Sequence, residues 1–336
     1  MKLGLMWGYW GAGPPPGIVP ITQEAERLGF DSVWTAESWG SDAFTPLAYL
    51  AGQTSTIKLG TSVVQLSART PTATAMAALT LDHLSGGRAM LGLGVSGPQV
   101  VEGWYGRPAT KPLARTREYV EIIRRVLARE APLEFDGQFY QHPYTGPGAT
   151  GLGKPLKAIT HPLRADLPIY LGAEGPKNVA MAAEIADGWL PLYYSPWHQD
   201  VYADSLAGAG PDFDIVAGVM LNIAPTVAEG LAPVKMMLAF YIGGMGAKGQ
   251  NFHTHLMGRF GYEDEATKIQ ELFFEGRRDE AYEVVPDEFA DAISLVGPPE
   301  RIAERVGAWE DSPVSTLLVY SPGNVETLRT IAELVL

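Results

Sequence analysis

The chain has 336 residues, 46% hydrophobic and 19% charged, with a formal net charge of −13 at pH 7 and no cysteine. The lack of cysteine excludes a disulfide framework, a thiolate metal site and a cysteine nucleophile, and the negative charge argues against general nucleic-acid binding. We find no signal-peptide pattern and no apolar run of the roughly 20 residues that a membrane span needs. We therefore expect a soluble cytoplasmic protein with no membrane or nucleic-acid partner.

Strands and helices alternate from the start of the chain. The strand candidates are continuous apolar runs rather than alternating ones, as expected of parallel strands that are covered on both faces. The predicted strands are residues 2–10, 32–37, 58–65, 89–95, 168–172, 188–194, 214–224 and 315–320. The predicted helices are residues 20–28, 44–53, 72–84, 115–129, 177–186, 199–206, 265–277, 286–294, 300–309 and 325–334.

Eight strands interleaved with helices predict a (β/α)8 barrel, with an open doubly wound sheet as the alternative. We expect a single barrel domain over residues 1–336 with insertions at about 131–166 and 229–264. The first insertion contains a predicted hairpin over residues 133–140 that turns at Asp136-Gly137, followed by a long loop rich in Gly and Pro. The second is rich in Met, Gly and aromatic residues, and we expect it to be helical and to control access to a site.

One Gly-rich motif suggests a dinucleotide site that the rest of the chain does not support. Residues 92–97 match G-x-G-x-x-G after a strand. However, the motif follows the fourth predicted strand, and the acidic residue expected about 20 positions later is Glu118, inside a predicted helix. The interpretation that remains is that these glycines allow a ligand to approach the backbone at the mouth of the barrel.

A second motif combines the features of a phosphate site. In residues 172–178 a strand ends, glycines give room, and Pro176 begins a helix. Free N–H groups, the helix dipole and Lys177 would all favour an anion there, although an ordinary glycine-proline junction has the same sequence. Residues 107–177 also carry a local charge of +4, which leaves −17 for the remainder. Either two helices have solvated basic faces, or this region receives an anionic ligand.

Several motifs of the chain resemble those of a known protein family. Residues 81–88, Leu-Asp-His-Leu-Ser-Gly-Gly-Arg, followed by Leu-Gly-Leu-Gly, are similar to the hallmark of the luciferase-like monooxygenase superfamily. Residues 175–177 with 183–189 look like its phosphate-binding element, and residues 96–104 resemble the actinobacterial type of the branch that uses the deazaflavin coenzyme F420. Residues 297–300 also fit. The resemblance covers about residues 1–325 and implies a metal-free barrel that transfers hydride.

The resemblance also implies particular site residues. In the F420 branch a bulge on the third strand carries a non-prolyl cis peptide bond under the ring, and the matching bond is Ser62–Val63, with Val63 and Val64 against the ring. Glu37 would lie near the polar edge of the ring as a cofactor or proton-relay residue. The branch has a histidine after this acid in a sugar-phosphate dehydrogenase, whereas Ser38 stands here, so we expect a different substrate and proton path. The other implied cofactor contacts are Gly94, Ser96, Gly97, Glu174, Gly175, Pro176 and Lys177.

The histidines give no metal pattern. His83 is expected to cap or pack in its helix. His253 and His255 stand two residues apart without a nearby cysteine, so they are interpreted as surface or lid residues. Aromatic residues at strand ends could border a planar ring and an apolar substrate, and the remaining aromatic residues are expected to pack in the core.

We therefore predict an F420-dependent oxidoreductase that transfers hydride between C5 of the deazaflavin and a small ketone, enone or alcohol. A flavin mononucleotide (FMN) monooxygenase on the same barrel is one alternative, and a non-catalytic flavin-binding protein is another. The resemblance also implies a homodimer formed through barrel helices.

Overall fold

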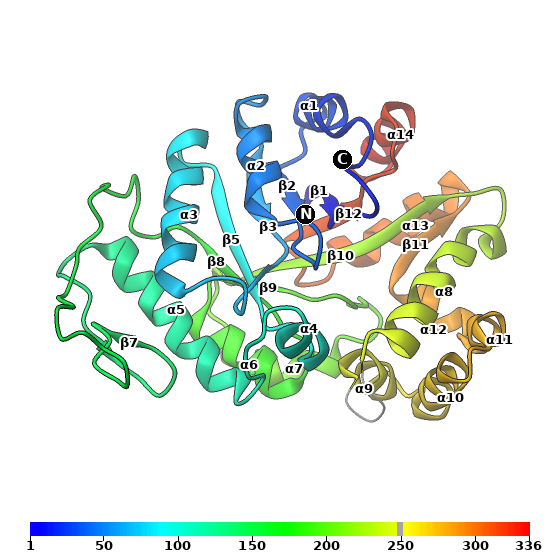
Figure 1. The fold of residues 1–336 in the computed structure, drawn as a ribbon. Coiled ribbons are helices and arrows are strands. Elements are labelled where there is room, and N and C mark those ends of the chain that lie inside the picture. The colour runs from blue at the N-terminus through cyan, green and yellow to red at the C-terminus, as the bar shows by residue number, and fades with distance from the viewer. Residues whose placement is uncertain (247–250) are drawn as a thin grey trace.

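A computed structural model describes residues 1–246 and 251–336, so residues 247–250 of the second predicted insertion lie outside it. In this part of the chain eight parallel strands form a closed barrel, because β10 pairs with both β9 and β12 (Figure 1). The predicted barrel is confirmed, and the open sheet is wrong. Its strands are β1 (Lys2–Gly8), β2 (Ser32–Thr35), β3 (Lys58–Thr61), β5 (Ala89–Gly94), β8 (Ile169–Gly172), β9 (Gly188–Leu190), β10 (Asp214–Ile223) and β12 (Thr316–Tyr320).

Side chains fill the interior of the barrel. One buried cluster combines residues from several strands, and in it the ring of Trp34 packs edge-on against Tyr170 at 5.5 Å. Gly60 is required beside Trp34, because a Cβ at residue 60 would lie 2.2 Å from the indole. Packing of this kind makes the barrel a solid core, so a ligand must bind at its end rather than pass through it.

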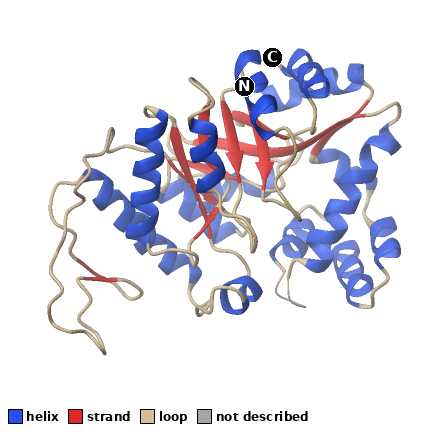
Figure 2. Cartoon of the chain, turned by 45° about the horizontal axis from the view of Figure 1, so that its top comes forward, coloured by secondary structure: helices blue, strands red, loops and turns tan. Residues whose placement is uncertain are grey.

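Helices cover the outside of the barrel (Figures 1 and 2). Proline at the first position and a threonine N-cap begin α3, whose Thr70 hydroxyl accepts the N–H of Ala73 at 3.2 Å. The outer helices are α1 (Ile18–Leu28), α2 (Phe44–Ala51), α3 (Pro71–Ser85), α5 (Pro112–Ala128), α6 (Pro176–Ile185), α7 (Asp200–Leu206), α13 (Pro299–Glu310) and α14 (Val325–Val335). None of the described helices is both long and apolar enough to cross a membrane.

The third predicted strand is interrupted. It splits into β3 and β4 (Val64–Gln65), and the peptide bond between them, Ser62–Val63, is cis, as the resemblance implies. Here β4 continues the pairing with β5 through Val64 and Leu93. The interruption lies at the carboxyl end of the barrel, where sites form in this fold.

One strand was not predicted. Residues 286–294 were expected to be a helix, but α12 (Asp287–Ala292) ends early and Ser294–Gly297 forms β11. This strand pairs with the second half of β10, beyond the part of β10 that pairs with β12. The long β10 therefore extends past the barrel and carries the second insertion outward.

The two insertions differ in structure. In the first, β6 (Phe135–Asp136) and β7 (Gln141–His142) form a hairpin, but its turn spans residues 137–140 rather than Asp136-Gly137. The Glu118 carboxylate determines the turn by accepting three successive backbone N–H groups, from residues 138–140. The second insertion is helical, as predicted. It contains α8 (Val227–Gly244) and α9 (Phe252–Arg259), and the helices that follow it, α10 (Glu263–Phe274) and α11 (Arg278–Val284), lie beside them at the edge of the barrel (Figure 1).

Candidate active site

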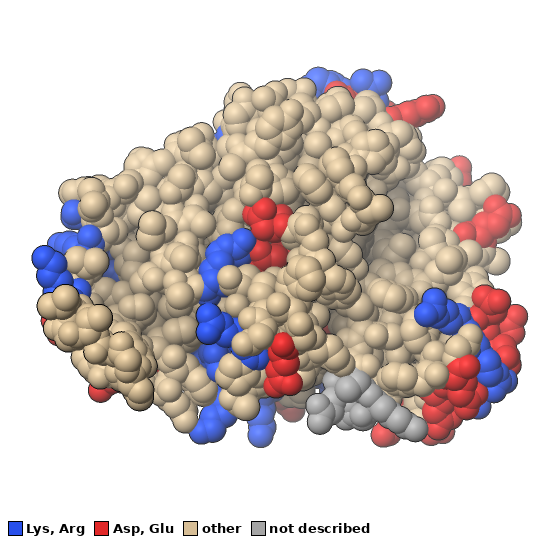
Figure 3. Space-filling model, in the orientation of Figure 1, with Lys and Arg blue, Asp and Glu red and all other residues tan. Residues whose placement is uncertain are grey.

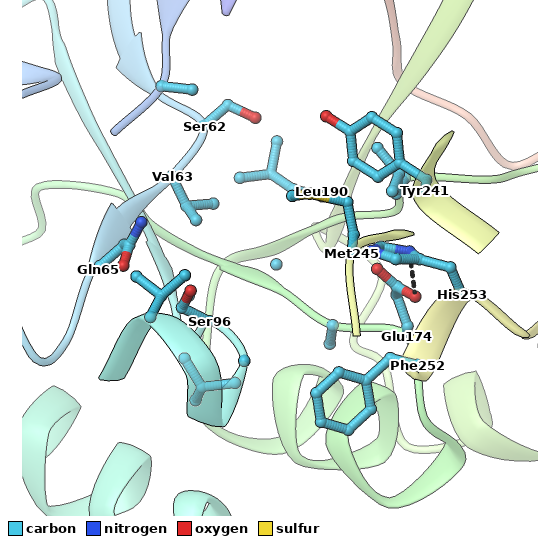
Figure 4. Close-up of a pocket in the computed structure, with 18 of the residues that line it drawn as sticks. Ser62, Val63, Gln65, Ser96, Glu174, Leu190, Tyr241, Met245, Phe252 and His253 are labelled. Atoms are coloured by element: carbon cyan, nitrogen blue, oxygen red, sulfur yellow. Dashed lines mark ion pairs between the residues drawn. The ribbon is translucent and has the colours of Figure 1, made fainter. Parts of the chain in front are cut away.

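A cavity of about 1050 Å³ opens at the carboxyl ends of the barrel strands. The strand ends and the starts of α4 (Pro98–Gly103), α5 and α6 form one part of its wall, and α8 and α9 form another (Figure 4). Every predicted site residue except Val64 lines it. These lining residues are Glu37, Ser38, Ser62, Val63, Gly94, Ser96, Gly97, Glu174, Gly175, Pro176 and Lys177.

Val64 does not contact the cavity, contrary to the prediction. It is fully buried in the main hydrophobic core. Neighbouring residues of an extended chain point to opposite faces, so Val63 and Val64 cannot both face a ligand. Val63 is the residue that lines the cavity.

Two glycines make room for the side chain of Val63. A Cβ at Gly94 would lie 2.4 Å from Cγ2 of Val63, and a Cβ at Gly172 would lie 3.1 Å from Cγ1. The valine therefore fits between the ends of β5 and β8 because both positions lack a side chain. The result is an apolar surface of fixed height on the floor of the cavity.

Glu37 is bound to the segment that carries Val63. Its side chain is 4% exposed, and one carboxylate oxygen lies 2.7 Å from Nη1 of Arg69. The other oxygen accepts the backbone N–H of Gln65 at 2.9 Å, and the backbone N–H of Glu37 donates to the carbonyl of Val63 at 3.2 Å. Both carboxylate oxygens are thus engaged, and the pair ties the end of β2 to the interrupted strand. Ser38 follows at the cavity wall.

Three helices begin at the cavity. The N-caps of α4, α5 and α6 are Gly97, Lys111 and Gly175, each helix has proline in its first turn, and no side chain caps any of the three. Uncapped N–H groups and the positive end of the helix dipole favour anions. Lys and Arg side chains gather near α5 and α6, whereas acidic ones gather over α10 and α11 (Figure 3).

The wall from the second insertion was not predicted in detail. Tyr241, Met245, Phe252 and His253 line the cavity, and the Tyr241 hydroxyl lies 3.2 Å from that of Tyr9. Burial, more than any nearby charge, raises the pKa of Tyr241 above its ordinary value. These residues lie on the opposite side of the cavity from Val63 (Figure 4).

His253 is the main site residue that sequence reasoning missed. It was interpreted as a surface or lid residue, but its ring lines the cavity and its Nδ1 lies 3.1 Å from a Glu174 carboxylate oxygen. His255, two residues further along the helix, is exposed as predicted, because two helical residues are separated by about 200° around the axis. His83 is outside the cavity, where its Nε2 contacts the carbonyl of His161 at 2.8 Å.

Comparison with known proteins places the chain in a family. A family model described as luciferase-like monooxygenase matches residues 7–316. A Mycobacterium tuberculosis protein, named provisionally as a coenzyme F420-dependent oxidoreductase, is 54% identical over 100% of this chain and 99% of its own. The 5,10-methylenetetrahydromethanopterin reductase of Archaeoglobus fulgidus is 30% identical over 91% of this chain and 90% of its own.

A solved structure has the same fold. The coenzyme F420-dependent tetrahydromethanopterin reductase from Methanopyrus kandleri superposes with a TM-score of 0.80 at 24% identity, covering 99% of this chain and 98% of its own. The family follows from the family model and the 54% identical relative. The chain belongs to the luciferase-like monooxygenase family.

Proposed function

We propose that the protein is a coenzyme F420-dependent oxidoreductase that transfers a hydride between C5 of the deazaflavin and a carbon of a small ketone, enone or alcohol. The names of the relatives support the cofactor. The observation that carries the proposal is that one cavity combines the glycine-bounded surface of Val63 with three uncapped helix starts. A flat ring and a phosphate need these two features close together.

The residues present fit the cofactor. A side chain at Gly94 or Gly172 would displace Val63, whereas a Cβ at Gly8 or Gly175 would meet nothing within 4 Å, so backbone is open to a ligand there. The start of α6 with Lys177 would hold the phosphate. The glutamate tail of F420 is anionic, which suits the basic side chains near α5 and α6 (Figure 3).

Each part of the site has a task in this reaction. When bound, the coenzyme supplies or accepts the hydride. Val63 would support one face of the ring, and Glu37 with Arg69 would hold the strand end that presents Val63. The wall from α8 and α9 would keep water from the other face and place the substrate there.

A titration tests the proposal. Purified protein is titrated with F420 and, separately, with FMN, and the fluorescence of the cofactor is followed. Hydride transfer to or from a panel of ketones, enones and alcohols is then measured by stopped flow. We expect saturable F420 binding and hydride transfer to or from part of the panel. Tight binding of FMN with consumption of oxygen would show an FMN monooxygenase instead. Cofactor binding without any transfer would indicate a flavin-binding protein.

We also propose that the enzyme is cytoplasmic, that it is a single barrel domain with two insertions, and that it forms a homodimer. Large apolar side chains on outer helices support a contact there: Tyr49 of α2 is 60% exposed, and Met76 and Leu84 of α3 are each 62% exposed. Analytical ultracentrifugation tests this, with Met76→Glu as the variant. We expect a dimer that Met76→Glu weakens, and a monomeric wild-type protein would contradict the proposal.

A further inference from the structure

The pair formed by Glu174 and His253 is fixed from several directions. Their side chains are only 18% and 14% exposed. Asn251 begins α9 by accepting the N–H of His253 at 2.9 Å, and its amide donates to the carbonyl of Ile242 in α8 at 2.7 Å. On the other side, Arg259 donates to the backbone carbonyl of Glu174. Both members of the pair are therefore held in position without a ligand.

This arrangement leaves one nitrogen of the histidine ring for a ligand. Nδ1 is buried 3.1 Å from a Glu174 carboxylate oxygen, although neither atom forms a hydrogen bond in the structure, and among the described residues no group forms a hydrogen bond with Nε2. The ring lines the cavity, and it packs edge-on against Tyr241 at 5.1 Å and Tyr193 at 5.9 Å. His253 thus lies at the cavity on the side opposite Val63 (Figure 4).

Four other titratable residues of the described cavity wall are less suited to proton transfer near neutral pH. Both carboxylate oxygens of Glu37 are engaged. Burial raises the pKa of Tyr241, and it raises the pKa of Tyr320 to about 12. Lys177 is exposed at the start of α6. Imidazole is the side chain whose charge ordinarily changes between about pH 5 and 8.

We propose that His253 is a catalytic residue that exchanges a proton with the substrate through Nε2, and that Glu174 is the positioning residue that orients it. This inference rests on the proposed function. In reduction, the carbonyl carbon of the substrate would accept the hydride that the bound coenzyme supplies, and the π electrons of the C=O bond would move to oxygen. That oxygen takes the proton from Nε2, and the neutral imidazole regains a proton from solvent. In oxidation of an alcohol, Nε2 takes the hydroxyl proton as the hydride leaves.

The same wall indicates the class of substrate. Around His253 the cavity is lined by Tyr241, Met245, Phe252 and Phe274, so the side facing the ring offers mainly aromatic and apolar contacts beside His253. We infer a flat, largely apolar ketone or enone, or the matching alcohol, with its oxygen toward Nε2. Tyr241, Met245, Phe252 and Phe274 are uncharged at neutral pH, so this wall does not favour a multiply charged substrate.

The test compares His253→Gln with His255→Gln, a matched control in which the altered side chain is exposed on the same helix. Both are first checked for folding by thermal unfolding, with His253→Asn as a second variant. We expect His253→Gln to bind F420 within about threefold of wild type, a difference of about 0.7 kcal/mol. Hydride transfer to an aryl ketone should fall by about 100-fold or more, and His255→Gln should match wild type.

Glu174→Gln gives a readout that needs no cofactor. In ¹⁵N NMR of the cofactor-free protein, the two ring nitrogens of His253 should be distinct in wild type, because the proposal places the proton on Nδ1, the nitrogen that faces Glu174. In Glu174→Gln this preference should weaken, and the pH dependence of hydride transfer should shift with it. Unchanged transfer in a folded His253 variant, or an unchanged His253 spectrum in Glu174→Gln, would overturn the inference. If wild type binds no F420, the proposed function itself fails and this inference with it.

Discussion

Gly94→Ala tests the surface on which the ring is proposed to lie. The added Cβ would lie 2.4 Å from Cγ2 of Val63, whereas real Cβ contacts are essentially never below 3.0 Å. Val63 must therefore move away from residue 94. We expect it to shift toward the cavity, which its side chain lines. Overpacking of this kind costs about 1–3 kcal/mol of stability.

The displaced valine would also raise the floor of the cavity. We expect the Kd for F420 to increase by about tenfold or more, equivalent to about 1.4 kcal/mol. Stability is measured by urea unfolding and binding by quenching of F420 fluorescence. Gly307→Ala in α13 is the matched control, since its Cβ would meet nothing within 4 Å; we expect it to leave binding unchanged and to stabilise the fold by about 0.4–1 kcal/mol.

A double variant, Val63→Ala combined with Gly94→Ala, tests whether the cost of Gly94→Ala comes from contact with Val63. Val63→Ala removes both Cγ atoms, and the Cβ of residue 63 then lies 3.4 Å from the new Cβ at residue 94, an ordinary contact. Combining it with Gly94→Ala should recover most of the lost stability, with a coupling energy of about 1 kcal/mol or more. Gly94→Ala with wild-type stability and binding, or a cost independent of Val63, would refute the account of this surface.

Three further predictions concern charge. Arg69→Met leaves the buried Glu37 carboxylate unpaired, so urea unfolding should show a loss of about 3 kcal/mol; a loss below about 1 kcal/mol would contradict the pairing. Lys177→Ala should weaken F420 binding several-fold at low salt and less at high salt; a salt-independent effect would argue against a phosphate contact. Hydrogen bonds from Arg27 and Arg329 lower the pKa of Glu24 from 4.5 to about 2. A lowered pKa in the folded state means that this stabilisation is complete above about pH 4.5 and is lost as the pH falls toward 2, so Glu24→Gln should reduce the acid sensitivity measured by urea unfolding.

The barrel could be predicted because its strands are buried on both faces. Such strands appear as apolar runs, and helices separated them at regular intervals. β11 was missed for a physical reason. Its four residues, Ser294–Gly297, follow α12 almost directly, so no turn signal separated the helix from the strand. A strand this short is specified by its partner, the extended half of β10.

The site was predictable where local sequence determines it. The glycines and prolines at the helix starts are visible in the chain, and Gly97, Pro112, Gly175 and Pro176 among them line the cavity. Which of Val63 and Val64 faces the cavity depends on where the strand is interrupted, because a shift of one residue exchanges the two faces of a strand. The contact between Glu174 and His253 joins distant segments, and no local pattern indicates it. Long-range packing of α9 against the barrel creates that pair.

A crystal structure of the protein with bound coenzyme F420 would test most directly the central claim, that the ring lies on Val63 and the phosphate at the start of α6. The account predicts the deazaflavin ring on Val63, its phosphate at the start of α6 beside Lys177, and the free face of the ring toward His253. A ring bound elsewhere, or a phosphate distant from α6, would contradict it.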